Sequence, residues 1–120
     1  MWEEKVATIL QSAERVNQSL SPESSERNYH NALEVELEFR GMDFLSEPRY
    51  PNMYRGVEVG YISPDMVIRG HKSGVIVELK SSKSPQRAEE QVRYYMDTFN
   101  DINVGVAISF RDSLEYEVYL

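Results

Sequence analysis

The sequence predicts a single α/β domain of the mixed α+β type, in which a central mixed β-sheet is flanked by helices. Apolar residues recur every three or four positions in the first third of the chain, whereas later ones form short runs typical of strands. The strand–helix–strand pattern over 74–108 is typical of a right-handed βαβ unit with parallel strands. A chain of 120 residues suits one domain, here 1–120. The expected order of elements is α-α-β-β-β-α-β-β.

Two helices are expected before the sheet. Residues 2–20 carry an amphipathic pattern, which predicts the first helix. Ser21 is a suitable N-cap for the second, with Pro22 at its first helical position. We expect the second helix to end near Arg40, because Gly41 is a natural residue to follow a helix C-terminus.

Glu26 occupies an unusual position in the second helix. The apolar side of this helix includes Tyr29 and Leu33, and Glu26 lies three residues before Tyr29. Glu26 is therefore expected on the core-facing stripe, whereas Glu34 and Glu38 are expected on the solvated side. An acid on a buried face needs a partner, a proton or a metal ion.

The middle of the chain has strand character. One strand begins at Phe44, and Pro48 and Pro51 limit its far end. Residues 53–61 indicate a strand interrupted at Gly56 by a bulge or a turn. The remaining expected elements are strands over 65–69 and 74–80, a helix over 84–99, a buried strand over 104–108 and an edge strand over 114–120.

Asp65, Glu78 and Lys80 are the most informative residues for chemistry. Side chains alternate along a strand, so Glu78 and Lys80 point to the same face, and Asp65 on the neighbouring strand completes the cluster. Two carboxylates suit a hard divalent cation such as Mg²⁺, and an adjacent lysine can orient or deprotonate water. The alternative interpretation is a salt bridge between Lys80 and an acid at a strand end. Gln91 and Tyr95 share one face of the following helix at i, i+4 spacing.

Composition limits the possible functions. Cysteine is absent, which excludes a disulfide framework and a thiolate zinc site. The two histidines, His30 and His71, are too few and too scattered for a histidine metal cluster. No apolar stretch is long enough to span a membrane and the start lacks a signal-peptide pattern, so we expect an intracellular, cytoplasmic protein that does not bind membranes.

The distribution of charge is uneven. The net charge of −7 argues against a generic nucleic-acid binder, but six basic residues stand against three acids between Arg69 and Arg93. This basic segment is either a solvated surface or a set of phosphate contacts. The residues expected to contact nucleic acid are Arg69, Lys72, Lys83 and Arg87.

The spacing of Asp65, Glu78 and Lys80 resembles the catalytic motif of the PD-(D/E)XK nuclease superfamily. Residues 20–29, with Glu26 and Tyr29 three apart, look like the signature of the GxxExxY protein family, a branch of that superfamily. The resemblance extends over nearly the whole chain, through Tyr54-Arg55-Gly56, the Gln91…Tyr95 pair and Ile108-Ser109-Phe110. Where the GxxExxY family has glycines, this sequence has Ser21 and Glu23. The resemblance implies a restriction-endonuclease-like core.

The resemblance also implies a function and a set of roles. It implies a metal-dependent nuclease that hydrolyses phosphodiester bonds, with DNA expected more than RNA. Asp65, Glu78 and the Leu79 backbone carbonyl would bind Mg²⁺ or Mn²⁺, and Lys80 would assist the reaction. Glu26 would hold water or a second ion. Gln91 and Tyr95 would position the scissile strand or the nucleophile.

Other functions remain open at this point. One is a non-catalytic module that binds nucleic acid or protein and keeps a nuclease fold. Another is a restriction-like or toxin-like nuclease that needs a partner for its specificity. A homodimer is also open, with Trp2, Tyr116 or Tyr119 as interface residues.

Overall fold

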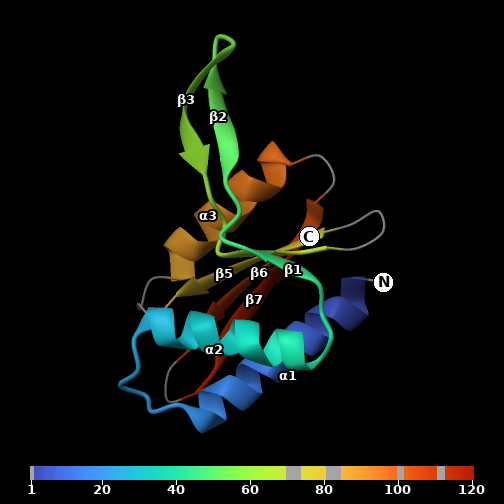
Figure 1. The fold of residues 1–120 in the computed structure, drawn as a ribbon, viewed down its shortest axis with the longest axis vertical. Coiled ribbons are helices and arrows are strands. Elements are labelled where there is room, and N and C mark those ends of the chain that lie inside the picture. The colour runs from blue at the N-terminus through green and yellow to red at the C-terminus, as the bar shows by residue number, and fades with distance from the viewer. Residues whose placement is uncertain (1, 70–73, 81–84, 100–101, 111–112) are drawn as a thin grey trace.

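The computed structural model describes residues 2–69, 74–80, 85–99, 102–110 and 113–120 (Figure 1). The described helices do not include one that is long and apolar enough to cross a membrane. The elements are α1 (Trp2–Ser19), α2 (Glu26–Phe39), β1 (Phe44–Ser46), β2 (Tyr50–Tyr54), β3 (Val57–Ile62), β4 (Met66–Ile68), β5 (Gly74–Lys80), α3 (Pro85–Thr98), β6 (Ile102–Ser109) and β7 (Glu115–Tyr119).

The predicted fold class is confirmed. A five-stranded mixed sheet has the order β1-β4-β5-β6-β7, in which β5 and β6 are parallel and the other neighbouring pairs are antiparallel. The predicted βαβ unit is therefore present as β5, α3 and β6. The expected order of elements contained too few strands, because β2 and β3 form a separate two-stranded sheet before β4.

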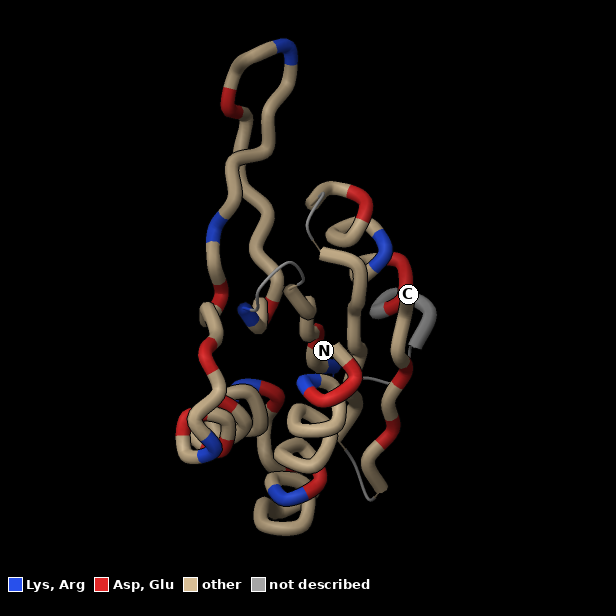
Figure 2. The backbone as a smooth tube through the Cα atoms, turned by 90° about the vertical axis from the view of Figure 1, so that its right-hand side faces the viewer, with Lys and Arg blue, Asp and Glu red and all other residues tan. Residues whose placement is uncertain are grey.

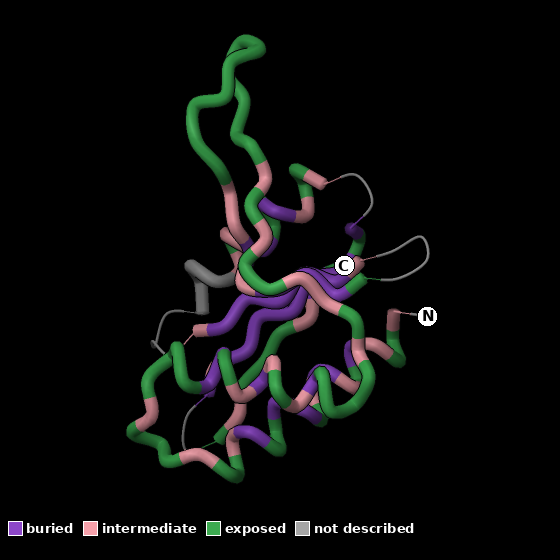
Figure 3. Tube along the Cα trace, in the orientation of Figure 1, coloured by how far each residue is buried: buried purple, intermediate pink, exposed green. Residues whose placement is uncertain are grey.

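Helices cover both faces of the main sheet. Val75, Val77 and Leu79 of β5 belong to the core that α1 and α2 build on one face, whereas Ile76 packs with Tyr95 of α3 on the other. This alternation follows from the period of two in a strand. The buried residues concentrate along the central strands and on the inner sides of the helices (Figure 3).

The second helix begins later than the sequence suggested. Its N-cap is Ser25, whose hydroxyl accepts a hydrogen bond from the Asn28 N–H at 3.1 Å. The expected cap, Ser21, lies in the preceding turn. There its carbonyl accepts a hydrogen bond from the buried Tyr29 hydroxyl at 2.8 Å. Because Tyr29 also stacks on Phe110, with 4.6 Å between the ring centroids, this contact ties the turn to the core.

The β2–β3 hairpin projects from the body of the protein at the top of Figure 1. The sequence left open whether Gly56 marks a bulge or a turn, and the structure has a turn: Arg55 and Gly56 have φ values of 51° and 79°. Positive φ at both central residues is typical of the two-residue type I′ turn, which matches the twist of the strands. A bulge lies elsewhere: Asn52 pairs with Gly60 and Met53 pairs with Glu58, so Val59 is the extra residue on β3.

Two prolines separate this hairpin from the main sheet. The ladder of β1 and β4 ends at the Ser46–Met66 pair, and the ladder of β2 and β3 starts at the Tyr50–Ile62 pair. Pro48 and Pro64 lie in the gap, where neither can donate a backbone hydrogen bond. Residues 44–68 are thus one long hairpin, broken just before Asp65.

We expect Gly105→Ala to destabilise the fold. A Cβ atom at this position in β6 would lie 2.2 Å from Cγ1 of Val92 and 3.0 Å from the sulfur of Met96, so α3 has to move away from the sheet. Overpacking of this kind costs about 1–3 kcal/mol of unfolding free energy, which urea denaturation measures. Gly60→Ala is the control, because nothing lies within 4 Å of its Cβ. Equal stability of the two variants would contradict this packing.

Candidate active site

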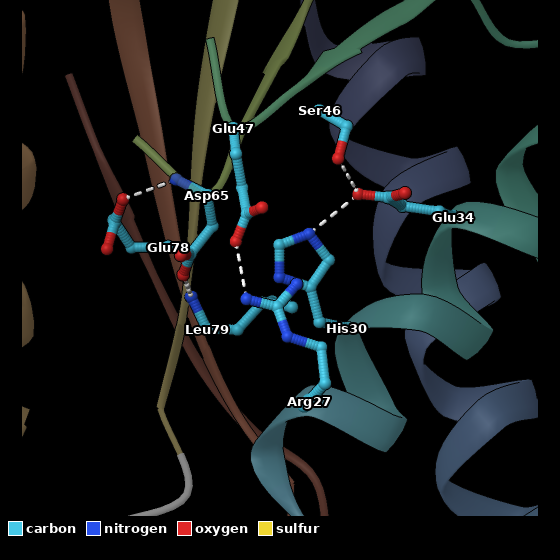
Figure 4. Close-up of polar contacts among 8 residues, drawn as sticks. All are labelled: Arg27, His30, Glu34, Ser46, Glu47, Asp65, Glu78 and Leu79. Carbon is cyan, nitrogen blue, oxygen red and sulfur yellow. Dashed lines mark hydrogen bonds and ion pairs between the residues drawn. The ribbon is translucent and has the colours of Figure 1, made fainter. Parts of the chain in front are cut away.

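Asp65 and Glu78 meet where the start of β4 adjoins the end of β5. Met66 pairs with Val77, so the residue before Met66 lies level with the residue after Val77. The Asp65 N–H donates to Oε1 of Glu78 at 2.9 Å, and the Leu79 N–H donates to Oδ2 of Asp65 at 2.7 Å (Figure 4). The two predicted carboxylates therefore belong to one site.

Burial dominates the electrostatics of this pair. Glu78 is 2% exposed and Asp65 is half-buried. Burial and, to a smaller extent, the neighbouring Asp65 charge raise the pKa of Glu78 to about 8. Burial also raises the pKa of Asp65, whereas its hydrogen bond from Leu79 and the nearby His30 and Lys80 lower it. The site thus holds a proton that two separate carboxylates in water would not hold at neutral pH.

A chain of hydrogen bonds connects Lys80 to α3. The Lys80 Nζ donates to Oε1 of Gln91 at 2.8 Å, and the Gln91 amide donates to the Tyr95 hydroxyl at 3.0 Å. That hydroxyl donates in turn to the Ser63 carbonyl at 3.5 Å. Burial raises the pKa of Tyr95, and the Glu78 charge adds to the rise. The predicted shared face of Gln91 and Tyr95 is confirmed, and the partner of Lys80 in this contact is an amide rather than the carboxylate of the salt-bridge interpretation.

Glu26 is a correction to the sequence analysis. Glu26 is exposed. It is the first residue of α2, and the buried residues of this helix begin only at Tyr29. An acid in the first turn interacts favourably with the helix dipole. Its charge nevertheless reaches the site, since it raises the pKa of both Asp65 and Glu78.

Arg69 is the one expected nucleic-acid contact whose side chain lies among the described residues. Arg69 is exposed just after β4, about 13 Å along the chain from Asp65 at the usual rise per strand residue. Lys72 and Lys83 lie outside the described residues, and so does the side chain of Arg87, so their roles stay predictions.

A polar group from α2 adjoins Asp65 and was missed by the sequence analysis. His30 is buried and its Nε2 lies 2.6 Å from Oε2 of Glu34, which also accepts a hydrogen bond from the Ser46 hydroxyl. Arg27 donates to Glu47 at 2.6 Å beside this group (Figure 4). The i, i+4 spacing of His30 and Glu34 was a signal for part of it.

Glu47 joins this polar group to the carboxylate pair. Its N–H donates to the Asp65 carbonyl at 2.9 Å, and its φ of 45° turns the chain at the break in the long hairpin. Positive φ is uncommon for a residue other than glycine. The backbone around Asp65 is therefore held from β5 through Glu78 and Leu79, and from the opposite side through Glu47.

Oxygen atoms are the donors that this site offers to a cation. Within the described ranges there is no group of three or more histidine, aspartate or glutamate side chains that could hold a metal ion. The two carboxylates need a backbone oxygen as a third donor. The N–H and C=O of one strand residue point to the same side, so the Leu79 carbonyl faces the side on which its N–H meets Asp65. This donor set fits a hard divalent cation.

The chain is similar to known proteins both in its sequence and in its fold. The sequence model of the PD-(D/E)XK nuclease superfamily matches residues 3–119. No curated protein matches the chain. The crystal structure of SSO0001 is similar, with a TM-score of 0.59 and 19% sequence identity over 78% of this chain and 49% of that one. This chain thus spans about half the length of SSO0001, and at such identity the likeness shows the fold alone. The narrower GxxExxY resemblance stays a prediction.

We expect the metal-free protein to lose stability as the pH rises from 4.5 toward 8. An ordinary glutamate carboxyl titrates near 4.5, whereas folded Glu78 keeps its proton to about 8. Between these values the folded state binds more protons than the unfolded state, so the free energy of unfolding falls with pH. The raised pKa of Asp65 acts in the same direction. Urea denaturation across this range, with a chelator present, measures the slope.

The Glu78→Gln variant tests the assignment of this slope. Glutamine keeps an oxygen that can accept the Asp65 N–H but has no proton to lose, so the slope should flatten and stability near pH 8 should rise. Glu38→Gln is the matched control, because Glu38 is exposed on α2, and it should keep the wild-type slope. A wild-type slope in Glu78→Gln would show that another group causes it.

Proposed function

Because the chain belongs to the PD-(D/E)XK nuclease superfamily, we propose that it is a metal-dependent nuclease that hydrolyses phosphodiester bonds of nucleic acid, with DNA as the expected substrate. The observation that carries the proposal is the junction of Asp65, Glu78 and Leu79, with Lys80 one residue further along β5. Superfamily membership supports nuclease activity in general terms. The preference for DNA, the metal ion and the individual roles belong to this proposal.

Asp65, Glu78 and the Leu79 carbonyl would hold Mg²⁺ or Mn²⁺. A buried carboxylate with a raised pKa is a costly feature unless a cation compensates its charge. When bound, the cation supplies Lewis-acid chemistry, lowering the pKa of water and balancing negative charge on the phosphate. Glu26 would add negative charge at the rim, where its side chain is exposed and within electrostatic reach of both carboxylates.

Lys80 would bring a positive charge to the reacting phosphodiester. Lys80 is half-buried, and its ammonium group donates a hydrogen bond to Gln91, whose amide is in turn hydrogen-bonded to the Tyr95 hydroxyl. A donor held in advance stabilises the charge that develops in the transition state without a further cost of orientation. Lys80 can also orient the attacking water through a hydrogen bond that its ammonium group donates. Gln91 and Tyr95 act on the reaction through Lys80.

A non-catalytic binding module is the second candidate, and one observation favours it. Each carboxylate already accepts a hydrogen bond from the main chain of the other strand, which is a structural role that needs no cation. In this case Asp65 and Glu78 would only close the end of the sheet. The two candidates differ in whether divalent cations bind and whether nucleic acid is cut.

We expect Mn²⁺ to bind the wild-type protein and Asp65→Asn to remove the binding. The variant keeps the size of the side chain but loses a ligand charge. Binding should tighten as the pH approaches 8, because the cation competes with the proton on Glu78. Calorimetry measures the binding, and the shift of the melting temperature with Mn²⁺ gives a second reading. Equal binding by Asp65→Asn would refute the metal site, and Asp43→Asn, an exposed aspartate, is the control.

We expect Lys80→Ala to reduce cleavage by roughly a hundredfold or more while it spares the fold. The side chain lies at the end of β5 and is only half-buried, so the free energy of unfolding should change by about 1 kcal/mol. The assay uses plasmid, linear duplex, single-stranded and branched DNA, and RNA, each with and without Mg²⁺ or Mn²⁺.

Two further variants make the cleavage assay decisive. Lys5→Ala removes a half-buried lysine from α1 and should leave cleavage unchanged, which excludes a general effect of charge. Glu26→Gln should reduce cleavage less than Lys80→Ala, because Glu26 is exposed at the rim. If the wild type cuts none of these substrates yet binds nucleic acid as tightly as Lys80→Ala does, the binding module is the correct function.

A further inference from the structure

Arg27 is an exposed cation beside the segment that carries Asp65. It lies in the first turn of α2, and its side chain is 57% exposed. Its guanidinium donates a hydrogen bond to Oε1 of Glu47 at 2.6 Å, and the main-chain N–H of Glu47 donates to the Asp65 carbonyl at 2.9 Å (Figure 4). Glu47 therefore connects the Arg27 side chain to the backbone at the candidate site.

The electrostatics of Arg27 agree with this position. The hydrogen bond with Glu47 and the charge of that carboxylate raise the pKa of Arg27, and the charges of Asp65 and Glu34 add to the rise. Opposite charges change a pKa in this way mainly at short range. The Arg27 guanidinium is thus within electrostatic reach of the carboxylate pair, although it comes from a different element of the fold.

The chemistry of the guanidinium group suits a phosphate. A guanidinium has five N–H donors in a planar fork that matches two phosphate oxygens, and the bond to Glu47 uses one of these donors. The Arg27 and Glu47 side chains are 57% and 44% exposed. Because a pair of exposed charges contributes little to stability, Arg27 can exchange Glu47 for a phosphate at a small cost.

An acidic protein needs local cations to bind a polyanion. Asp and Glu outnumber Lys and Arg by 20 to 13 in this chain (Figure 2). Repulsion between these acids and phosphates opposes binding wherever cations do not compensate for it. Lys80 is half-buried and bound to Gln91, whereas the Arg27 side chain is open to solvent. Arg27 can therefore reach phosphates that lie outside the carboxylate pair.

We propose that Arg27 binds a backbone phosphate of the nucleic acid next to the phosphodiester that is cleaved, and that Glu47 orients the guanidinium before the nucleic acid arrives. This inference rests on the proposed function, because it needs a nucleic acid that lies across Asp65 and Glu78. A phosphate contact fixes the position of a strand but does not read its sequence. Arg27 is thus a residue that positions the substrate, whereas the two carboxylates hold the cation.

A structural role of the Arg27–Glu47 pair is the alternative. The pair would then only tie α2 to the connection between β1 and β2. Glu47 has a φ of 45°, a conformation that glycine adopts more easily, yet the chain has an acidic side chain here that faces Arg27. The two roles predict different effects when the Glu47 charge is removed. A structural pair is weakened from either side, whereas a phosphate-binding arginine loses a competitor.

Fluorescence anisotropy with a short labelled DNA duplex, one of its single strands and the matching RNA tests the proposal. A chelator is present, so that binding is measured without cleavage. Arg27→Ala should weaken binding by about three- to tenfold, and the slope of log affinity against log salt should fall by about 1. Arg93→Ala is the matched control, because Arg93 of α3 is 53% exposed and forms the same kind of pair with Glu89. It should bind as the wild type does.

Glu47→Gln separates the two roles. Glutamine keeps the acceptor oxygen for Arg27 but removes a negative charge beside the expected phosphate. Binding should therefore become tighter, by about threefold. Arg27→Lys keeps the charge without the planar fork and should keep part of the affinity. Circular dichroism and melting temperature confirm that all variants fold.

The binding and cleavage assays together separate this inference from the proposed function. In the cleavage assay Arg27→Ala should raise KM and leave kcat unchanged, whereas Lys80→Ala lowers kcat. If the wild type binds nucleic acid, Arg27→Ala weakens the binding and nothing is cut, the Arg27 contact stands and the nuclease function fails. The inference is overturned if Arg27→Ala binds as tightly as the wild type, if Glu47→Gln weakens binding as much as Arg27→Ala does, or if the wild type binds none of the three probes.

Discussion

The reciprocal contact between Asp65 and the Glu78–Leu79 segment is the interaction on which this structure depends most. It joins β4 to β5 at a point where Pro64 prevents the regular ladder from continuing. Each carboxylate accepts a hydrogen bond from a main-chain N–H of the opposite strand. The two side chains thus replace hydrogen bonds that a regular ladder would form between main-chain groups. The contact also fixes the direction of the chain that enters the hairpin and the distance between the two acids.

The carboxylate pair of Asp65 and Glu78 lowers the stability of the folded protein where β4 adjoins β5. Apolar residues normally occupy positions like these, because a buried carboxylate loses its hydration. That loss is the main reason why the pKa values of Asp65 and Glu78 are raised. The cost falls on the folded state when the pH is high enough to ionise the pair. Perturbed acids with a lysine one residue away are typical of a catalytic or metal-binding site. The hydrophobic layers of α1, α2 and α3 on the two faces of the sheet carry the stability that offsets it.

Features that depend on local periodicity were predicted correctly from the sequence. Features whose position is set by a contact between distant parts of the chain were not. Alternation in β5 placed Glu78 and Lys80 on one face, and helical spacing placed Gln91 beside Tyr95. The expectation for Glu26 was wrong because α2 begins at Glu26, with Ser25 as its N-cap, so Glu26 lies in an exposed first turn although it is three residues before the buried Tyr29. The polar group around His30 was missed because Ser46 reaches Glu34 from another element.

The break in the long hairpin over 44–68 determines where the candidate site lies in the fold. On one side of the break, β1 and β4 are part of the main sheet, and β4 begins directly after Asp65. On the other side, β2 and β3 form a separate two-stranded sheet. The prolines and the positive φ of Glu47 produce both results, because an unbroken ladder would bury Asp65 in regular pairing. A change that straightens this segment, at Pro48 or Pro64, would therefore alter the carboxylate pair and the direction of the hairpin together. The position of the candidate site and the direction of the hairpin are thus two consequences of one backbone constraint.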